Sequence, residues 1–130
     1  MNNLINREAL AEFVQSDEDM LADLASIFAD LMPECIGQME RAVANDDSNT
    51  LREVAHQAKS RYAYFFCSPL VDIASELEKL ASDNELDGTD DMLEQLRTGT
   101  IGLVEELASI TGLPLEMAKQ EATIPAIANE

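Results

Sequence analysis

The chain has 130 residues, of which 46% are hydrophobic, and its aromatic residues are limited to four phenylalanines and two tyrosines. This length and composition predict one domain with a mainly aliphatic core. With 26 acidic and 8 basic side chains, the formal net charge is -18. Such a charge repels nucleic acid and anionic membrane surfaces, so the expected partners are proteins or cations.

Targeting signals are not evident in the sequence. No window approaches the roughly 18 consecutive apolar residues of a membrane span. The first ten residues, MNNLINREAL, lack the basic and then apolar layout of a secretory signal. Cys35 and Cys67 are far apart in the sequence, and we interpret them as buried thiols in a reducing compartment. We therefore expect a cytoplasmic protein.

Helical periodicity begins near the N-terminus. Residues 6–14 form a short candidate helix, and residues 17–44 form a long one with apolar positions three and four apart. Ser16 or Asp17 can cap the long helix. Asp47 can cap a third helix that reaches Phe66, and Thr50 with Glu53 offers a competing capping-box start.

Two further helices complete the pattern. We expect Ser68 to be the N-cap of the fourth helix and Pro69 its first helical residue. A last helix is predicted over residues 90–110, with apolar spacings that alternate between three and four, as in an antiparallel bundle. The predicted fold class is all-α, an antiparallel four-helix bundle with a short N-terminal capping helix. Residues 1–110 would form the bundle, and residues 111–130 a C-terminal extension that is partly docked or flexible.

The single histidine of the chain, His56, lies in the third predicted helix. At about 100° per residue, the core face of this helix is well defined, and His56 points about 140° away from it. That core face comprises Leu51, Val54, Ala55, Ala58, Tyr62 and Phe65. We therefore expect His56 to be exposed to solvent and not to be a core histidine.

The side of the helix that carries His56 also carries Arg52, Lys59, Ser60 and Ala63. Cations beside a solvent-facing imidazole favour its neutral, nucleophilic form. They also suit an anion attached to the ring, which Lys59 could contact from the i+3 position. This is the chemistry of a phosphohistidine. A solvated helix face that happens to carry a histidine is the alternative interpretation.

The sequence at this point resembles the histidine-containing phosphotransfer (HPt) domain family. The resemblance includes the AH..K motif at Ala55, His56 and Lys59, and the capped start at Asp47 with Leu51. It also includes the preceding helix, DLASIFADLMPECIGQMERAV, and the following one that ends SELEKLA. It covers roughly residues 12–110, in the element order of the family.

The resemblance implies a function. His56 would accept a phosphoryl group from an aspartyl phosphate on a receiver domain and pass it to an aspartate of a second one, while Lys59 steadies that group. Arg52, Ser60 and Ala63 would lie on the docking face. The implied partners are the receiver domain of a hybrid sensor kinase and a response regulator. The protein would have no cofactor of its own, because Mg²⁺ would be held by the receiver, and we expect a monomer.

Two departures from the family pattern concern the residues after Lys59. Ser60 stands where the family usually has glycine, and Tyr64, Phe65 and Phe66 stand where small residues are common. We interpret these changes as marks of partner specificity. A non-catalytic helical adaptor, which binds a receiver or another protein through the same face, is the alternative function.

The sequence evidence for other kinds of site is weaker. The stretch DNELDGTDDMLE nearly matches a calcium-binding EF-hand loop, but glutamate occupies its third position and Asp90 its eighth. We favour a solvated turn between helices. The chain has no glycine-rich phosphate loop, and one histidine with two distant cysteines suits neither a hydrolase triad nor a zinc site. We expect no metal site and no kinase activity.

Overall fold

The computed structural model describes residues 4–15 and 17–117, and within them every regular element is an α-helix. The five helices are α1 (Arg7–Val14), α2 (Glu18–Ala44), α3 (Ser48–Tyr64), α4 (Ser68–Ser82) and α5 (Thr89–Thr111). The all-α prediction is confirmed. No helix in this part of the chain is long and apolar enough to cross a membrane.

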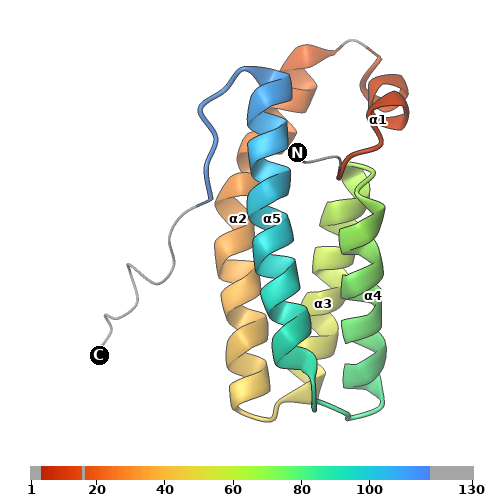
Figure 1. The fold of residues 1–130 in the computed structure, drawn as a ribbon, viewed down its shortest axis with the longest axis vertical. Helices are drawn as coiled ribbons and strands as arrows, with labels where there is room; N and C mark the ends of the chain where they lie inside the picture. The colour runs from red at the N-terminus through yellow and green to blue at the C-terminus, as the bar shows by residue number, and fades with distance from the viewer. Residues whose placement is uncertain (1–3, 16, 118–130) are drawn as a thin grey trace.

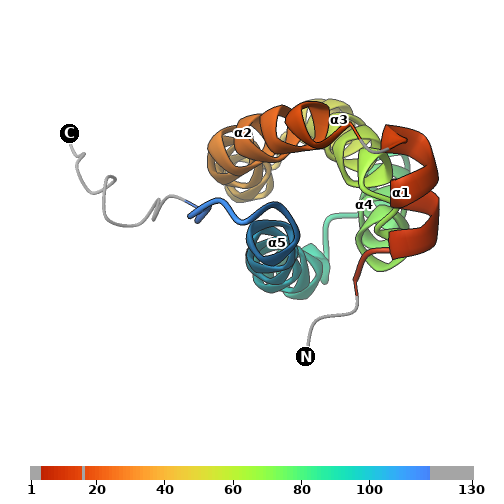
Figure 2. The same ribbon diagram turned by 90° about the horizontal axis from the view of Figure 1, so that it is seen from above.

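The four long helices stand side by side and alternate in direction (Figure 1). α2 packs on α3 and α5, and α4 packs on the same two helices, so the four enclose one core. The short α1 lies across the end of the bundle above α3 and α4 (Figure 2). Its backbone joins the α3–α4 turn, where the Asn6 N–H donates to the carbonyl of Phe66 at 3.0 Å.

Local capping fixes where the helices begin. Asp17 accepts a hydrogen bond from the N–H of Met20 at the start of α2. Asp47 caps α3, because its carboxylate accepts both the N–H and the hydroxyl of Thr50, at 3.2 and 2.7 Å. α3 therefore begins directly after Asp47, and not at the alternative capping box of Thr50 and Glu53.

The turn between α3 and α4 differs from the prediction. α3 ends at Tyr64, two residues earlier than expected, and Phe66 has a left-handed φ of 53°. The N-cap of α4 is Cys67 and not Ser68, and it forms no side-chain capping bond. The physical reason is packing, because this tight turn buries Cys67 completely and leaves Ser68 exposed inside the first turn of α4.

The core contains the predicted face of α3. All six residues of that face are buried, and Tyr62 is fully enclosed. The Tyr62 hydroxyl lies 2.8 Å from Thr100 Oγ1 on α5, and the Thr100 hydroxyl donates to the carbonyl of Leu96 at 2.6 Å. Burial raises the pKa of the Tyr62 phenol, so it stays a neutral hydrogen-bonding group. The hydroxyl groups of Tyr62 and Thr100 are therefore both buried and both hydrogen-bonded.

The C-terminal end of the bundle is only partly described. α5 continues to Thr111 and ends at Gly112, whose φ is 76°. Leu115 and Met117 are partly buried against the core. The predicted division of the chain after residue 110 stays a prediction, and residues 118–130 of the predicted extension lie outside the described part.

Candidate functional site

His56 lies on α3 and faces solvent, as the helical geometry predicted. Its side chain is 61% exposed, whereas the preceding residue, Ala55, is completely buried. The imidazole is thus presented from a rigid helix whose opposite face packs into the core.

A carboxylate from α4, that of Glu78, joins His56 to Lys59. Glu78 Oε2 lies 2.9 Å from Nδ1 of His56, and Oε1 lies 2.8 Å from Nζ of Lys59. The lysine and glutamate side chains are 30% and 24% exposed. The three groups form a cluster across the α3–α4 surface, which we call the His56 cluster.

The electrostatics of the His56 cluster favour an ionised carboxylate. The hydrogen bond from Lys59 and then that from His56 hold the pKa of the Glu78 carboxyl below its ordinary value. An ionised carboxylate can only accept, so the ring nitrogen that faces it must carry a proton. In the neutral imidazole the lone pair is then on Nε2, the other ring nitrogen. The contact with Glu78 therefore favours the neutral tautomer whose Nε2 carries the free lone pair.

Sequence reasoning missed Glu78. It placed Arg52, Lys59, Ser60 and Ala63 beside His56 but no carboxylate, and the contact with Glu78 corrects this picture. A helical wheel gives the directions of the side chains on α3, but it does not show how α4 is rotated relative to α3. A usable signal did exist, because Glu78 directly follows Leu77 on the inner face of α4 and therefore lies at the edge of that face. Acidic residues at the edges of the inner face of α4 were therefore the candidates for a contact with His56.

The other predicted site residues lie on the same side of α3 as His56. Arg52 is half-buried one turn before the imidazole, and Ser60 and Ala63 are exposed after it. Ser60 and Ala63 line an open hollow of about 340 Å³ together with Phe13, Tyr64 and Phe66. Two of the three predicted docking residues, Ser60 and Ala63, therefore border a surface that is partly aromatic.

A second, smaller hollow lies between α2 and α3. Its volume is about 160 Å³ and its lining is almost wholly apolar, with Arg61 at one side. The other lining residues are Leu24, Ile27, Phe28, Leu31, Tyr64 and Phe65. Ile27, Leu31 and Tyr64 are exposed. Tyr64 borders both hollows, so the two adjoin at this residue.

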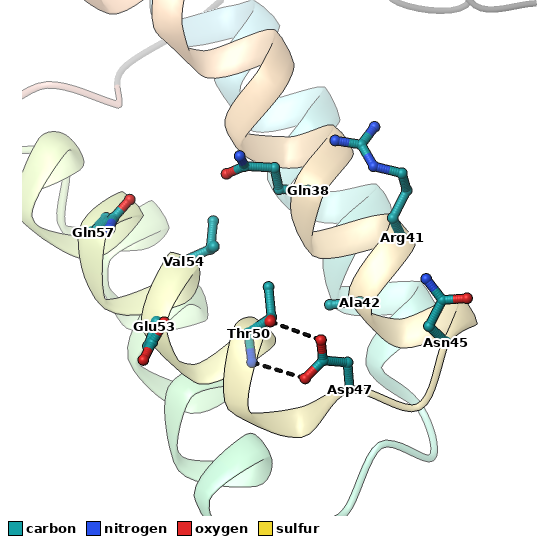
Figure 3. Close-up of a pocket in the computed structure, with 9 residues that line it drawn as sticks. All are labelled: Gln38, Arg41, Ala42, Asn45, Asp47, Thr50, Glu53, Val54 and Gln57. Carbon is teal, nitrogen blue, oxygen red and sulfur yellow. Dashed lines mark hydrogen bonds between the residues drawn. The ribbon is translucent and has the colours of Figure 1, made fainter. Parts of the chain in front are cut away.

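A polar hollow of about 350 Å³ lies where α2 ends and α3 begins (Figure 3). Three of its polar side chains, those of Arg41, Asp47 and Thr50, take part in hydrogen bonds or ion pairs. Asp47 caps α3 by accepting the N–H of Thr50, and Arg41 pairs with Glu34 at 2.7 Å. We assign no chemistry to this hollow. Across the described residues, no group of three or more histidine, cysteine, aspartate or glutamate side chains could hold a metal ion.

Fold and site together define a class, an all-α bundle that presents its histidine on an exposed helix face. A family model of the Hpt domain matches residues 23–109, well over half of the chain. The chain belongs to the Hpt domain family. Proteins of this family act in histidine phosphotransfer within two-component phosphorelays, as intermediates that interact with receiver domains and not as kinases. The comparisons with curated proteins and with solved structures found no match.

Proposed function

We propose that His56 is the phosphoacceptor of this Hpt domain and that its Nε2 carries the phosphoryl group. The observation that carries this proposal is the hydrogen bond between Nδ1 and Glu78, which leaves the Nε2 lone pair available on an exposed ring. His56 is also the only histidine in the chain.

The transfer proceeds as a displacement at phosphorus. The Nε2 lone pair attacks the phosphorus atom of an aspartyl phosphate on a receiver domain, the N–P bond forms, and the P–O bond to the aspartate breaks. The aspartate leaves as a carboxylate. The ring keeps its Nδ1 proton and becomes a cation, which the Glu78 carboxylate stabilises. The reverse steps pass the phosphoryl group to the aspartate of a second receiver domain.

Lys59 steadies the phosphoryl group in this proposal. Its ammonium group lies on the same side of α3 as the imidazole and is held at 2.8 Å by Glu78. Its four-carbon side chain is flexible, so the ammonium can move to the phosphoryl oxygens once they arrive. Mg²⁺ is held by the receiver domain, and the Hpt domain brings no cofactor of its own.

The docking face comprises Arg52, Ser60 and Ala63 and continues onto the exposed apolar residues of α2 and α3. In this proposal the partners are the receiver domain of a hybrid sensor kinase and a response regulator. The protein works as a monomer in the cytoplasm. Its charge of -18 opposes binding to nucleic acid and anionic membranes.

One observation favours a second candidate, the non-catalytic adaptor. Tyr64 is 54% exposed, and it lies next to two hollows that a partner could fill without any chemistry at His56. An adaptor retains partner binding after His56→Ala, and no phosphoryl group is ever transferred to it.

The experiment is incubation with a receiver domain that carries radiolabelled aspartyl phosphate. Phosphotransfer predicts an acid-labile, base-stable label on the wild-type chain and none on His56→Gln. A label that persists in His56→Gln, or a wild type that no receiver of the same genome labels, contradicts the proposal.

A further inference from the structure

One charged residue is buried within the described part of the chain, and it lies away from the His56 cluster. Glu106 on α5 is only 3% exposed. Its Oε1 accepts the N–H of Leu4, and its Oε2 accepts Nε of Arg7, both at 3.1 Å. Nη2 of Arg7 also lies 3.1 Å from Oε2. A buried carboxylate is costly unless it is paired, and this one is paired with Leu4 and with Arg7, the first residue of α1.

The segment that leads into α1, and α1 itself, are also fixed to the α3–α4 turn. The Asn6 N–H donates to the Phe66 carbonyl, and the Phe13 ring packs edge-on against the Phe66 ring with centroids 5.9 Å apart. Leu10 and Val14 are buried beneath α1. α1, which lies over α3 and α4 in Figure 2, is thus anchored both to a buried carboxylate of α5 and to the turn that follows α3.

Phe13 connects this arrangement to the docking face. It is 45% exposed, and it lines the same hollow as Ser60 and Ala63. Ser60 is one helical turn beyond His56. One wall of the surface next to the phosphoacceptor is therefore supplied by α1, whose placement depends on Glu106.

We propose that Glu106 is a positioning residue, which holds Phe13 of α1 in the receiver-docking face through its contacts with Leu4 and Arg7. The inference rests on the proposed function at His56. The occupant is the receiver domain, which would cover Phe13 and Tyr64 when it docks over His56. Continuity of the hollow with the His56 face argues for this occupant, since a receiver that reaches Nε2 must also cover Ser60.

The test compares two phosphodonors, a phosphorylated receiver domain and phosphoramidate, a small molecule that needs no docking surface. We expect Phe13→Ala to raise the KM for the receiver several-fold without changing the transfer rate at saturation. In the same variant, we expect phosphoramidate to label His56 at the wild-type rate. Glu106→Gln, which keeps an acceptor for Leu4 but loses the charge that binds Arg7, gives the same pattern. The matched control is Ile101→Ala on α5, because Ile101 is 43% exposed and should leave KM unchanged.

The double variant separates positioning from general destabilisation. If Glu106 acts through Phe13, then Glu106→Gln adds nothing to KM in a Phe13→Ala background. Additive effects, an unchanged KM in Glu106→Gln, or an equal loss with phosphoramidate would overturn the inference. If Glu106→Gln does not fold, Arg7→Met replaces it, since the Arg7 side chain is 58% exposed. An unchanged KM in Arg7→Met is then the contrary result.

The failure of the proposed function gives a different result. In that case neither donor labels His56 in the wild-type chain. If His56 is labelled but Phe13→Ala and Ile101→Ala have the same KM, only the inference about α1 fails.

Discussion

Glu78 on α4 contacts both residues of the predicted phosphotransfer pair, with Oε2 2.9 Å from Nδ1 of His56 and Oε1 2.8 Å from Nζ of Lys59. The carboxylate therefore has two effects. It fixes the tautomer of the imidazole, and it keeps the ammonium group close to the site before any phosphoryl group arrives.

Removal of this carboxylate should slow phosphotransfer. We expect Glu78→Ala to lower the transfer rate about tenfold, or about 1.4 kcal/mol in activation free energy, because the phosphorylated ring loses its counter-charge. A time course of quenched transfer reactions measures the rate. Glu76→Ala is the matched control, since Glu76 is exposed on the same helix. Equal rates for the two variants would show that Glu78 does not support the reaction.

The Glu78 interactions should also make stability depend on pH. The pKa of the carboxyl is lowered from 4.5 by Lys59 and His56. A lowered pKa contributes stability that is fully present above 4.5 and is lost as the pH falls through the folded-state value. The effect should be small, because the pair is partly solvated. Urea unfolding of wild type and Glu78→Gln across the acidic range measures it. The difference between them should shrink on acidification, and a difference that grows would refute this prediction.

Gly99 should be intolerant of a side chain. A Cβ at this position would lie 2.5 Å from Cδ2 of Leu70, so α4 and α5 would have to separate or Leu70 would have to move. We expect Gly99→Ala to destabilise the domain by about 1–3 kcal/mol, partly offset by the better helix propensity of alanine. Denaturant unfolding measures the change. Ser109→Ala, on the exposed side of α5, is the control and should be nearly neutral. A neutral or stabilising Gly99→Ala would contradict the close approach.

The apolar hollow between α2 and α3 should contribute to receiver binding. Leu31 and Ile101 have nearly equal exposure, 44% and 43%, but only Leu31 borders the hollow. Leu31→Ser should weaken receiver binding by about 1 kcal/mol, several-fold in Kd, because an apolar side chain is lost from a buried contact. Ile101→Ser should bind as the wild type does. Calorimetric titration with the receiver domain compares them, and equal affinities would place the receiver elsewhere.

The fold was largely predictable, because periodicity and capping are local properties of the sequence. The core face of α3 and the Asp47 cap are both as predicted. The Ser68 cap was wrong because burial of Cys67, a tertiary effect, decides where α4 begins. Local chemistry alone favours serine at that position.

The site was predictable only in part. The exposure of His56 follows from one helix, whereas its contact with Glu78 depends on how two helices are rotated against each other. The same is true of Glu106 and Leu4, which are 102 positions apart in the chain. A single sequence contains the residue types of such pairs but not their juxtaposition.

The most direct test of the account is nitrogen NMR of the His56 ring after exposure to a phosphorylated receiver domain. We expect one phosphohistidine, bonded through Nε2, with the proton retained on Nδ1. A ring that stays unmodified under transfer conditions, or that carries the phosphoryl group on Nδ1, would contradict it.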